Sequence, residues 1–144
     1  MQVPYTAKKQ LTNVRHKLIE KEEKAQSTLE LADSYPNAFN ALSQANASTI
    51  ADYIQSMKIE LNLSDHYKRD VVLLLCKFSK YYSNKSFKNL TREDVLAFLN
   101  RFIKKEQYDP LHKWIGTYNI YRQHLLRFFK WLYYPNDLWK EASL

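Results

Sequence analysis

Glycine and cysteine are almost absent from this sequence of 144 residues, which contains one of each, Gly116 and Cys76. Tight β-hairpin turns usually need glycine, so its scarcity favours a helical protein over one built from strands. A single thiol cannot form an intramolecular disulfide or a zinc cluster. Cys76 ends the apolar run 71–76, and we therefore expect it to be a buried structural residue.

Long apolar runs are missing as well. The longest is far shorter than the ~20 residues that a membrane-spanning helix needs. The N-terminus is polar and basic and has no apolar stretch after it, so it does not resemble a secretory signal. We expect a cytoplasmic protein with no membrane partner.

The sequence also lacks the motifs of common cofactor and metal sites. It has no glycine-rich phosphate loop, and its four histidines are scattered along the chain. A phosphate-binding cofactor usually requires such a loop, and a zinc ion requires closely spaced histidines or cysteines. We therefore expect no cofactor and no metal.

Positive charge is what the sequence has in excess. The formal net charge is +7, and the calculated isoelectric point is about 9.4. Residues 1–45 contain six Lys or Arg and five Asp or Glu, whereas residues 46–144 contain sixteen and ten. This balance favours a polyanionic partner, with nucleic acid first and an anionic membrane second.

Residues 7–33 are polar and rich in helix-forming residues. Leu11, Leu18 and Ala25 are seven residues apart, which is a short and imperfect heptad pattern. The pattern predicts either a solvated helix or a coiled-coil contact with a partner. The Ser-Tyr-Pro-Asn sequence at 34–37 breaks it, so we predict that residues 1–45 are a helical arm followed by a linker over 34–46.

Four further helices are predicted from residue 46 onward by apolar residues at helical spacing. Ser64 is a suitable N-cap for the second, and Thr91 with Asp94 approximates a capping box for the third. Pro135 ends the fourth. The predicted ranges are 48–62, 64–83, 91 to about 105, and 113–133. The expected fold is therefore all-α, with a four-helix domain over 46–135, an N-terminal helical arm and a tail over 136–144.

The fourth predicted helix combines a broad aromatic face with a cationic one. Its apolar stripe is centred near Tyr118 and Leu125. The opposite half carries Lys113, Gly116, Gln123, His124, Arg127 and Lys130, with Thr117 and Arg122 on its flanks. A helix fits the major groove of DNA, where such side chains contact phosphates and base edges. The alternative is an ordinary solvated face, on which Gly116 has no special role.

The four-helix pattern resembles the core-binding, SAM-like domain of Xer-type and archaeal tyrosine recombinases. The resemblance covers about residues 49–135. It rests on TIADYIQSMKIELNLSDHYKRDVVLLLCKFSKYY (49–82), LTREDVLAFLNRF (90–102) and LHKWIGTYNIYRQHLLRFFKWLYYP (111–135). The last segment is the most specific, because a threonine precedes a basic turn and then the aromatic pair Phe128 and Phe129.

The resemblance implies a domain that clamps double-stranded DNA at a recombination site through its second and fourth helices. It also implies contacts with other recombinase protomers or with a separate catalytic domain. The DNA contacts that it implies are Lys68 and Arg69 in the second helix, and Lys113, Thr117, Arg122, Arg127 and Lys130 in the fourth.

The catalytic residues of that family are not expected in this sequence. Recombinases use a tyrosine nucleophile with arginines and histidines around the scissile phosphate. The chain contains one His-x-x-Arg sequence, His124 to Arg127, but Leu125 lies in the predicted core stripe and no arginine box precedes it. We therefore expect a DNA-binding protein without enzymatic activity of its own. A stand-alone accessory or regulatory DNA-binding protein and a helical protein–protein interaction module are the alternatives.

Overall fold

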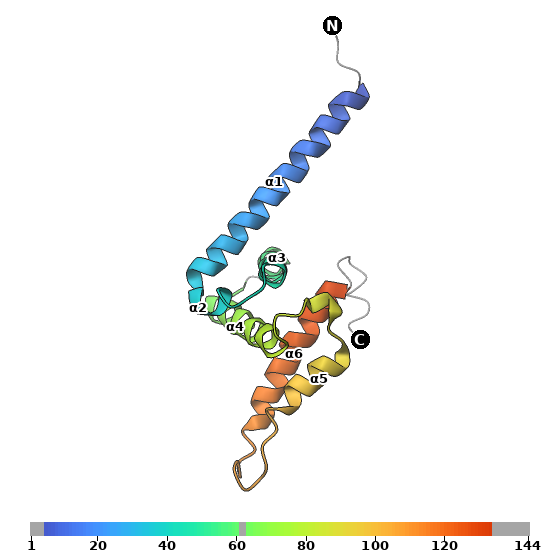
Figure 1. Cartoon of the computed structure of the whole chain (residues 1–144). Coiled ribbons are helices and arrows are strands. Elements are labelled where there is room, and N and C mark those ends of the chain that lie inside the picture. Colours follow the sequence, from blue (N-terminus) through green and yellow to red (C-terminus); the bar gives the residue numbers. More distant parts are fainter. Residues whose placement is uncertain (1–4, 61–62, 134–144) are drawn as a thin grey trace.

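The computed structural model describes residues 5–60 and 63–133, and this part of the chain contains helices and loops but no strand (Figure 1). The predicted all-α class is therefore confirmed. The helices are α1 (Tyr5–Ser34), α2 (Pro36–Phe39), α3 (Gln44–Glu60), α4 (Asp65–Tyr81), the 3-10 helix η1 (Phe87–Asn89), α5 (Arg92–Asn100) and α6 (Trp114–Tyr133). The predicted tail, 136–144, lies outside the described residues.

Two of the predicted helix starts are confirmed by their capping hydrogen bonds. The Ser64 hydroxyl accepts a hydrogen bond from the backbone N–H of Tyr67 at 3.2 Å, at the start of α4. At the start of α5, the Asp94 N–H donates to the Thr91 hydroxyl at 3.3 Å, and the Asp94 carboxylate accepts from the Thr91 N–H at 2.8 Å. Both arrangements pair backbone donors that a helix end otherwise leaves free.

The predicted end of the third helix is wrong. The structure ends α5 at Asn100, whereas the sequence pattern extended this helix to Lys104 and Lys105. The N–H groups of Phe102 and Ile103 donate to carbonyls three residues earlier, at 3.0 and 3.3 Å. This tighter turn stops the α-helix, so Lys104 and Lys105 lie in the loop before α6.

The segment 34–46, predicted as a linker, contains α2 and the start of α3. Phe39 at the end of α2 is buried, and so is Asn46 in the first turn of α3. The Asn46 amide donates to the Ser79 hydroxyl and to the Lys85 carbonyl, both at 2.9 Å, and accepts from the Phe87 N–H at 3.2 Å. These partners are 33 to 41 residues away, so local sequence could not reveal that this segment is part of the fold.

The core lies where α3, α4, α5 and α6 meet, and aromatic side chains fill much of it. Phe78 of α4 contacts Phe98 of α5 with ring centroids 5.1 Å apart, and contacts Phe129 of α6 at 5.8 Å. The C-terminal end of α1 joins this core through Leu31, which is buried. From Glu20 onward α1 also lies along α3, and its N-terminal part extends away from the other helices (Figure 1).

Candidate nucleic-acid interface

The C-terminal half of α6 anchors this helix in the core, as the apolar stripe predicted. Leu125 and Phe128 are fully buried. The Phe128 ring lies 5.1 Å from that of Tyr53 on α3 and 5.0 Å from that of Phe87 on η1. The N-terminal half is mostly exposed, so α6 is held at one end and presented to solvent at the other.

The start of α6 is fixed by the loop that precedes it. The Asp109 carboxylate accepts a hydrogen bond from the Trp114 N–H at 2.9 Å, and the His112 N–H donates to the Asp109 carbonyl at 3.0 Å. The bond from Trp114, with smaller contributions from Lys113 and Lys104, lowers the pKa of Asp109. The positive N-terminal end of the α6 helix dipole also stabilises a carboxylate at this position. The loop therefore folds back onto the first turn of α6.

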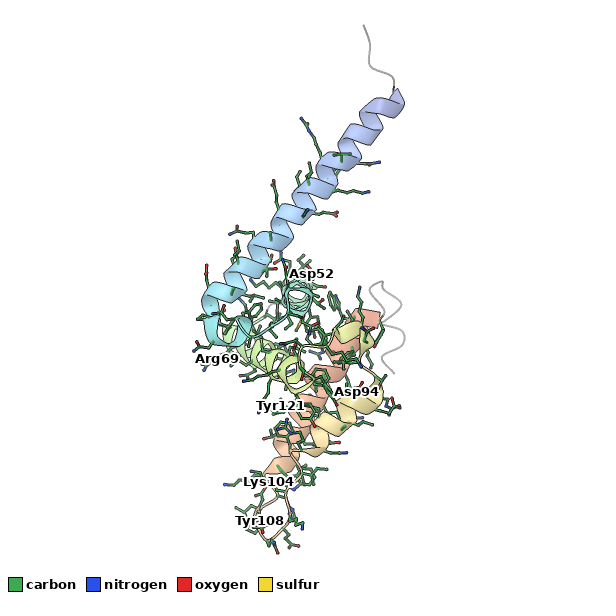
Figure 2. All side chains as sticks on the ribbon, in the orientation of Figure 1. Asp52, Arg69, Asp94, Lys104, Tyr108 and Tyr121 are labelled. Carbon is green, nitrogen blue, oxygen red and sulfur yellow. The ribbon has the colours of Figure 1, made fainter. Side chains whose placement is uncertain are left out.

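This folding creates a surface cavity of about 210 Å³ that brings loop and helix side chains together. Its lining residues are Phe102, Lys104, Tyr108, Asp109, Lys113, Trp114 and Thr117. Lys104 and Tyr108 lie at the end of the molecule where α6 begins (Figure 2). Lys104 thus joins the predicted residues Lys113 and Thr117, although the sequence pattern placed it in a helix.

The exposed residues of α6 do not form one face. At 3.6 residues per turn, Thr117 and Arg127 lie within about 80° of one another around the helix axis, and Lys113 directly precedes the helix. Arg122 is also exposed but lies about 140° from both Thr117 and Arg127. Lys130 is half-buried in the last turn. Lys104, Lys113 and Thr117 line one cavity, whereas Arg127 lies on the same side of α6 about 15 Å farther along its axis than Thr117, with the buried His124 between them. We call Lys104, Lys113, Thr117 and Arg127 the α6 outer face, and Arg122 lies on the other side of the helix.

Arg127 is positioned by α4. Its guanidinium donates a hydrogen bond to the Tyr67 hydroxyl at 2.7 Å. Tyr67 in turn packs edge-on against His124, with ring centroids 5.1 Å apart. The Arg127 side chain remains exposed, so this contact orients a cation at the surface without burying it.

His124 was predicted on the cationic half of α6, and this prediction is wrong. Only 8% of its surface is exposed, because Tyr67 of α4 covers it. Burial lowers the pKa of His124, and nearby Arg127 lowers it further, while Asp70 opposes them. The histidine of the His-x-x-Arg sequence is therefore a packing residue, as is Leu125 beside it.

The lowered pKa of His124 predicts acid sensitivity of the fold. A histidine whose pKa is lower in the folded state binds fewer protons there than in the unfolded chain. The stability that it contributes is present above the unfolded pKa of ~6.5 and is lost as pH falls below that value. We expect the melting temperature of wild type to fall more between pH 7 and pH 5 than that of His124→Gln. Equal falls in the two proteins would contradict this assignment.

The two α4 cations predicted to contact DNA do not lie with the α6 outer face. Lys68 is half-buried, and its pKa is lowered by burial first and then by Lys58 of α3. Arg69 lines a groove with residues 34–38 of α1 and α2, as its position beside α2 indicates (Figure 2). The helical periodicity placed both on the solvent side of α4, but it could not show which neighbour each would meet.

Lys77 of α4 was not among the predicted contacts, yet it lies near α6. Its ammonium is 5.1 Å from the centre of the Phe102 ring, and that ring packs against Tyr121 of α6 at 5.1 Å. Lys77 is exposed. In the sequence, only its position three residues after the core residue Leu74 suggests that Lys77 lies near a neighbouring helix. Many solvated lysines have the same spacing from a core residue.

Charge is distributed unevenly over the molecule. Residues 101–133 carry seven Lys or Arg and only two acidic residues, Glu106 and Asp109, whereas residues 1–60 carry seven of each sign. Glu20, Glu23, Glu30 and Asp52 line a groove between α1 and α3. The segment 101–133, which contains α6, is therefore cationic, and the α1–α3 groove is acidic.

Neither similarity to known proteins nor another kind of site points to a function for this chain. No protein-family model, curated protein or solved structure matches this chain. Within residues 5–60 and 63–133, no group of three or more His, Cys, Asp or Glu is placed to hold a metal ion. No helix in the same part of the chain is long and apolar enough to cross a membrane.

Proposed function

We propose that this chain binds duplex DNA along the α6 outer face, as the core-binding domain of a tyrosine recombinase acting in DNA integration or site-specific recombination. In this role it clamps the recombination site and carries out no chemistry alone. The observation that carries the proposal is the combination in α6 of a buried aromatic anchor with an exposed half that has no acidic residue. The sequence resemblance to the SAM-like domain supports the recombinase context.

The α6 outer face has side chains that suit a phosphate backbone. Lys104, Lys113 and Thr117 line the cavity at the start of α6 and can contact phosphates, while the Asp109 carboxylate caps the Trp114 N–H there. Arg127 adds a guanidinium that Tyr67 holds in place. Gln123 is exposed one turn before Arg127 and is of a type that pairs with adenine in the major groove.

The charge asymmetry supports the same orientation. The α1–α3 groove repels phosphates, while the segment 101–133 attracts them, so long-range electrostatics directs DNA toward α6. Binding of this kind is dominated by release of counterions and falls steeply with salt.

The proposal is tested by fluorescence anisotropy of labelled duplex DNA titrated with the protein at several salt concentrations. We expect binding at low salt and a negative slope of log affinity against log salt, of about −3 for phosphate contacts made by Lys104, Lys113 and Arg127. The absence of binding at low salt would reject the proposal. It would favour a protein–protein interaction module, for which the exposed Tyr108, Leu111 and Ile120 offer apolar contacts.

Gly116 provides a sharper test of close DNA approach. A Cβ added at Gly116 would meet nothing within 4 Å, and its φ is not positive, so the fold itself does not require glycine there. Gly116→Ala should stabilise α6 by up to about 1 kcal/mol. If the DNA backbone approaches Gly116, the same substitution should weaken DNA binding. We expect a higher melting temperature with lower DNA affinity, and unchanged affinity would show that Gly116 does not meet DNA.

A further inference from the structure

An apolar stripe runs along α1 on the side that no other helix covers. It consists of Val14, Leu18, Ala25 and Leu29, which lie within about 60° of one another around the helix axis. Val14, Leu18 and Leu29 are 54%, 56% and 60% exposed. These four apolar residues share one side of α1 over about four turns, with Lys21 and Glu22 between Leu18 and Ala25, and so differ from isolated surface leucines.

The helix α1 packs against α3 through the opposite side. Glu23, Ser27 and Glu30 face the α1–α3 groove, and Leu31 enters the core. These residues lie roughly 130–180° around the helix from the stripe. The intramolecular contact with α3 and the stripe therefore use different sides of α1, and both can be occupied at once.

The length of α1 indicates that the stripe needs a partner. Thirty residues make a helix of about 45 Å, and its N-terminal half extends beyond the rest of the molecule (Figure 1). Described side chains from Asn13 to Glu23 are all exposed. A helix without tertiary packing is marginal in water, and most helices in proteins are stabilised by burying an apolar face.

The charges beside the stripe suit a second copy of this chain. One edge carries Arg15 and Glu22, and the other carries Lys17 and Lys21. In a parallel pair Glu22 meets Lys17 of the second copy, and in an antiparallel pair it can meet Arg15 of the second copy. Residues 1–45 have a net charge of only +1, so two such arms do not repel one another strongly, and they do not attract a polyanion.

We propose that α1 is a dimerisation helix that pairs with α1 of a second copy through Val14, Leu18, Ala25 and Leu29. An antiparallel pair places the two copies of the domain at opposite ends of the coiled coil, and a parallel pair places both at the same end. If the proposed function holds, the dimer presents two DNA-binding faces, and linkage raises the affinity for paired sites. The pairing itself does not depend on DNA binding.

The experiment is sedimentation equilibrium of the full chain without DNA, from low micromolar to near-millimolar concentration. The molar mass should rise from 17.3 kDa toward twice that value as concentration increases. Val14→Glu with Leu18→Glu should keep the protein at the monomer mass throughout. Asn13→Glu with His16→Glu is the matched control, because it adds the same two carboxylates to exposed positions on the other side of α1.

Three results would overturn the proposal. Wild type could remain monomeric at every concentration, the stripe variant could dimerise like wild type, or the control could lose dimerisation equally. Circular dichroism of each variant shows whether the domain stays folded. Binding of each variant to a short duplex with one site is measured separately, so loss of the dimer and loss of DNA binding are distinguished.

Discussion

Replacement of Lys104 and Lys113 by glutamate lowers the affinity for duplex DNA by about a hundredfold at low salt. Each lysine that contacts a phosphate releases counterions, so its loss weakens binding to all sequences and reduces the salt slope by about one. The two positions border one cavity at the start of α6 and are exposed, so the fold should be unaffected. Anisotropy titrations of both proteins at several salt concentrations give the affinity ratio and the change in slope.

The matched control is Lys88→Glu with Arg92→Glu, which changes the net charge by the same amount. Both residues are exposed, and they lie in η1 and at the start of α5, at the opposite end of α5 from the cavity. We expect a loss of affinity below about tenfold, from the change in overall charge alone. If the control loses as much affinity as the Lys104 and Lys113 variant, attraction by net charge explains binding and the α6 outer face has no special role.

Truncation of Phe128 to alanine lowers the free energy of unfolding by about 3–5 kcal/mol. Phe128 has no exposed surface and contacts rings from α3, η1 and α6 itself, so its removal leaves a large cavity. This loss is a large fraction of the stability of a small domain. Urea unfolding followed by circular dichroism measures it.

Ile120→Ala is the comparison for Phe128→Ala, because it removes an apolar side chain from the same helix. Ile120 is 53% exposed, and we expect its truncation to change stability by less than about 1 kcal/mol. Equal effects at the two positions would mean that α6 is not anchored by its C-terminal half.

The sequence predicted the helices that carry strong local signals. Ser64 and Thr91 mark helix starts through short-range side-chain bonds, and their roles follow from a few neighbouring residues. The buried side of α6 around Leu125 was also predictable, because apolar residues at helical spacing along twenty residues leave one choice of inner face. The all-α class follows from these features and from the lack of glycine.

Features that depend on distant residues were not predictable from the sequence. His124 is buried because Tyr67, 57 positions away in the sequence, covers it, whereas the helical wheel placed it outside. Lys68 and Arg69 meet α3 and α2, so they lie away from α6. Lys104 reaches the candidate site only because α5 ends early and the loop folds back through Asp109. Each case depends on packing between different helices, which the hydrophobic periodicity within a single helix cannot reveal.

The central claim, that DNA lies along the α6 outer face, is tested most directly by titrating isotope-labelled protein with a short duplex and following backbone amide signals by NMR. The account predicts the largest shifts in residues 104–117 and around Arg127, with little change in α3 or along residues 13–23 of α1. Shifts concentrated on Arg69 and the α1–α2 junction, or an absence of shifts at low salt, would contradict it.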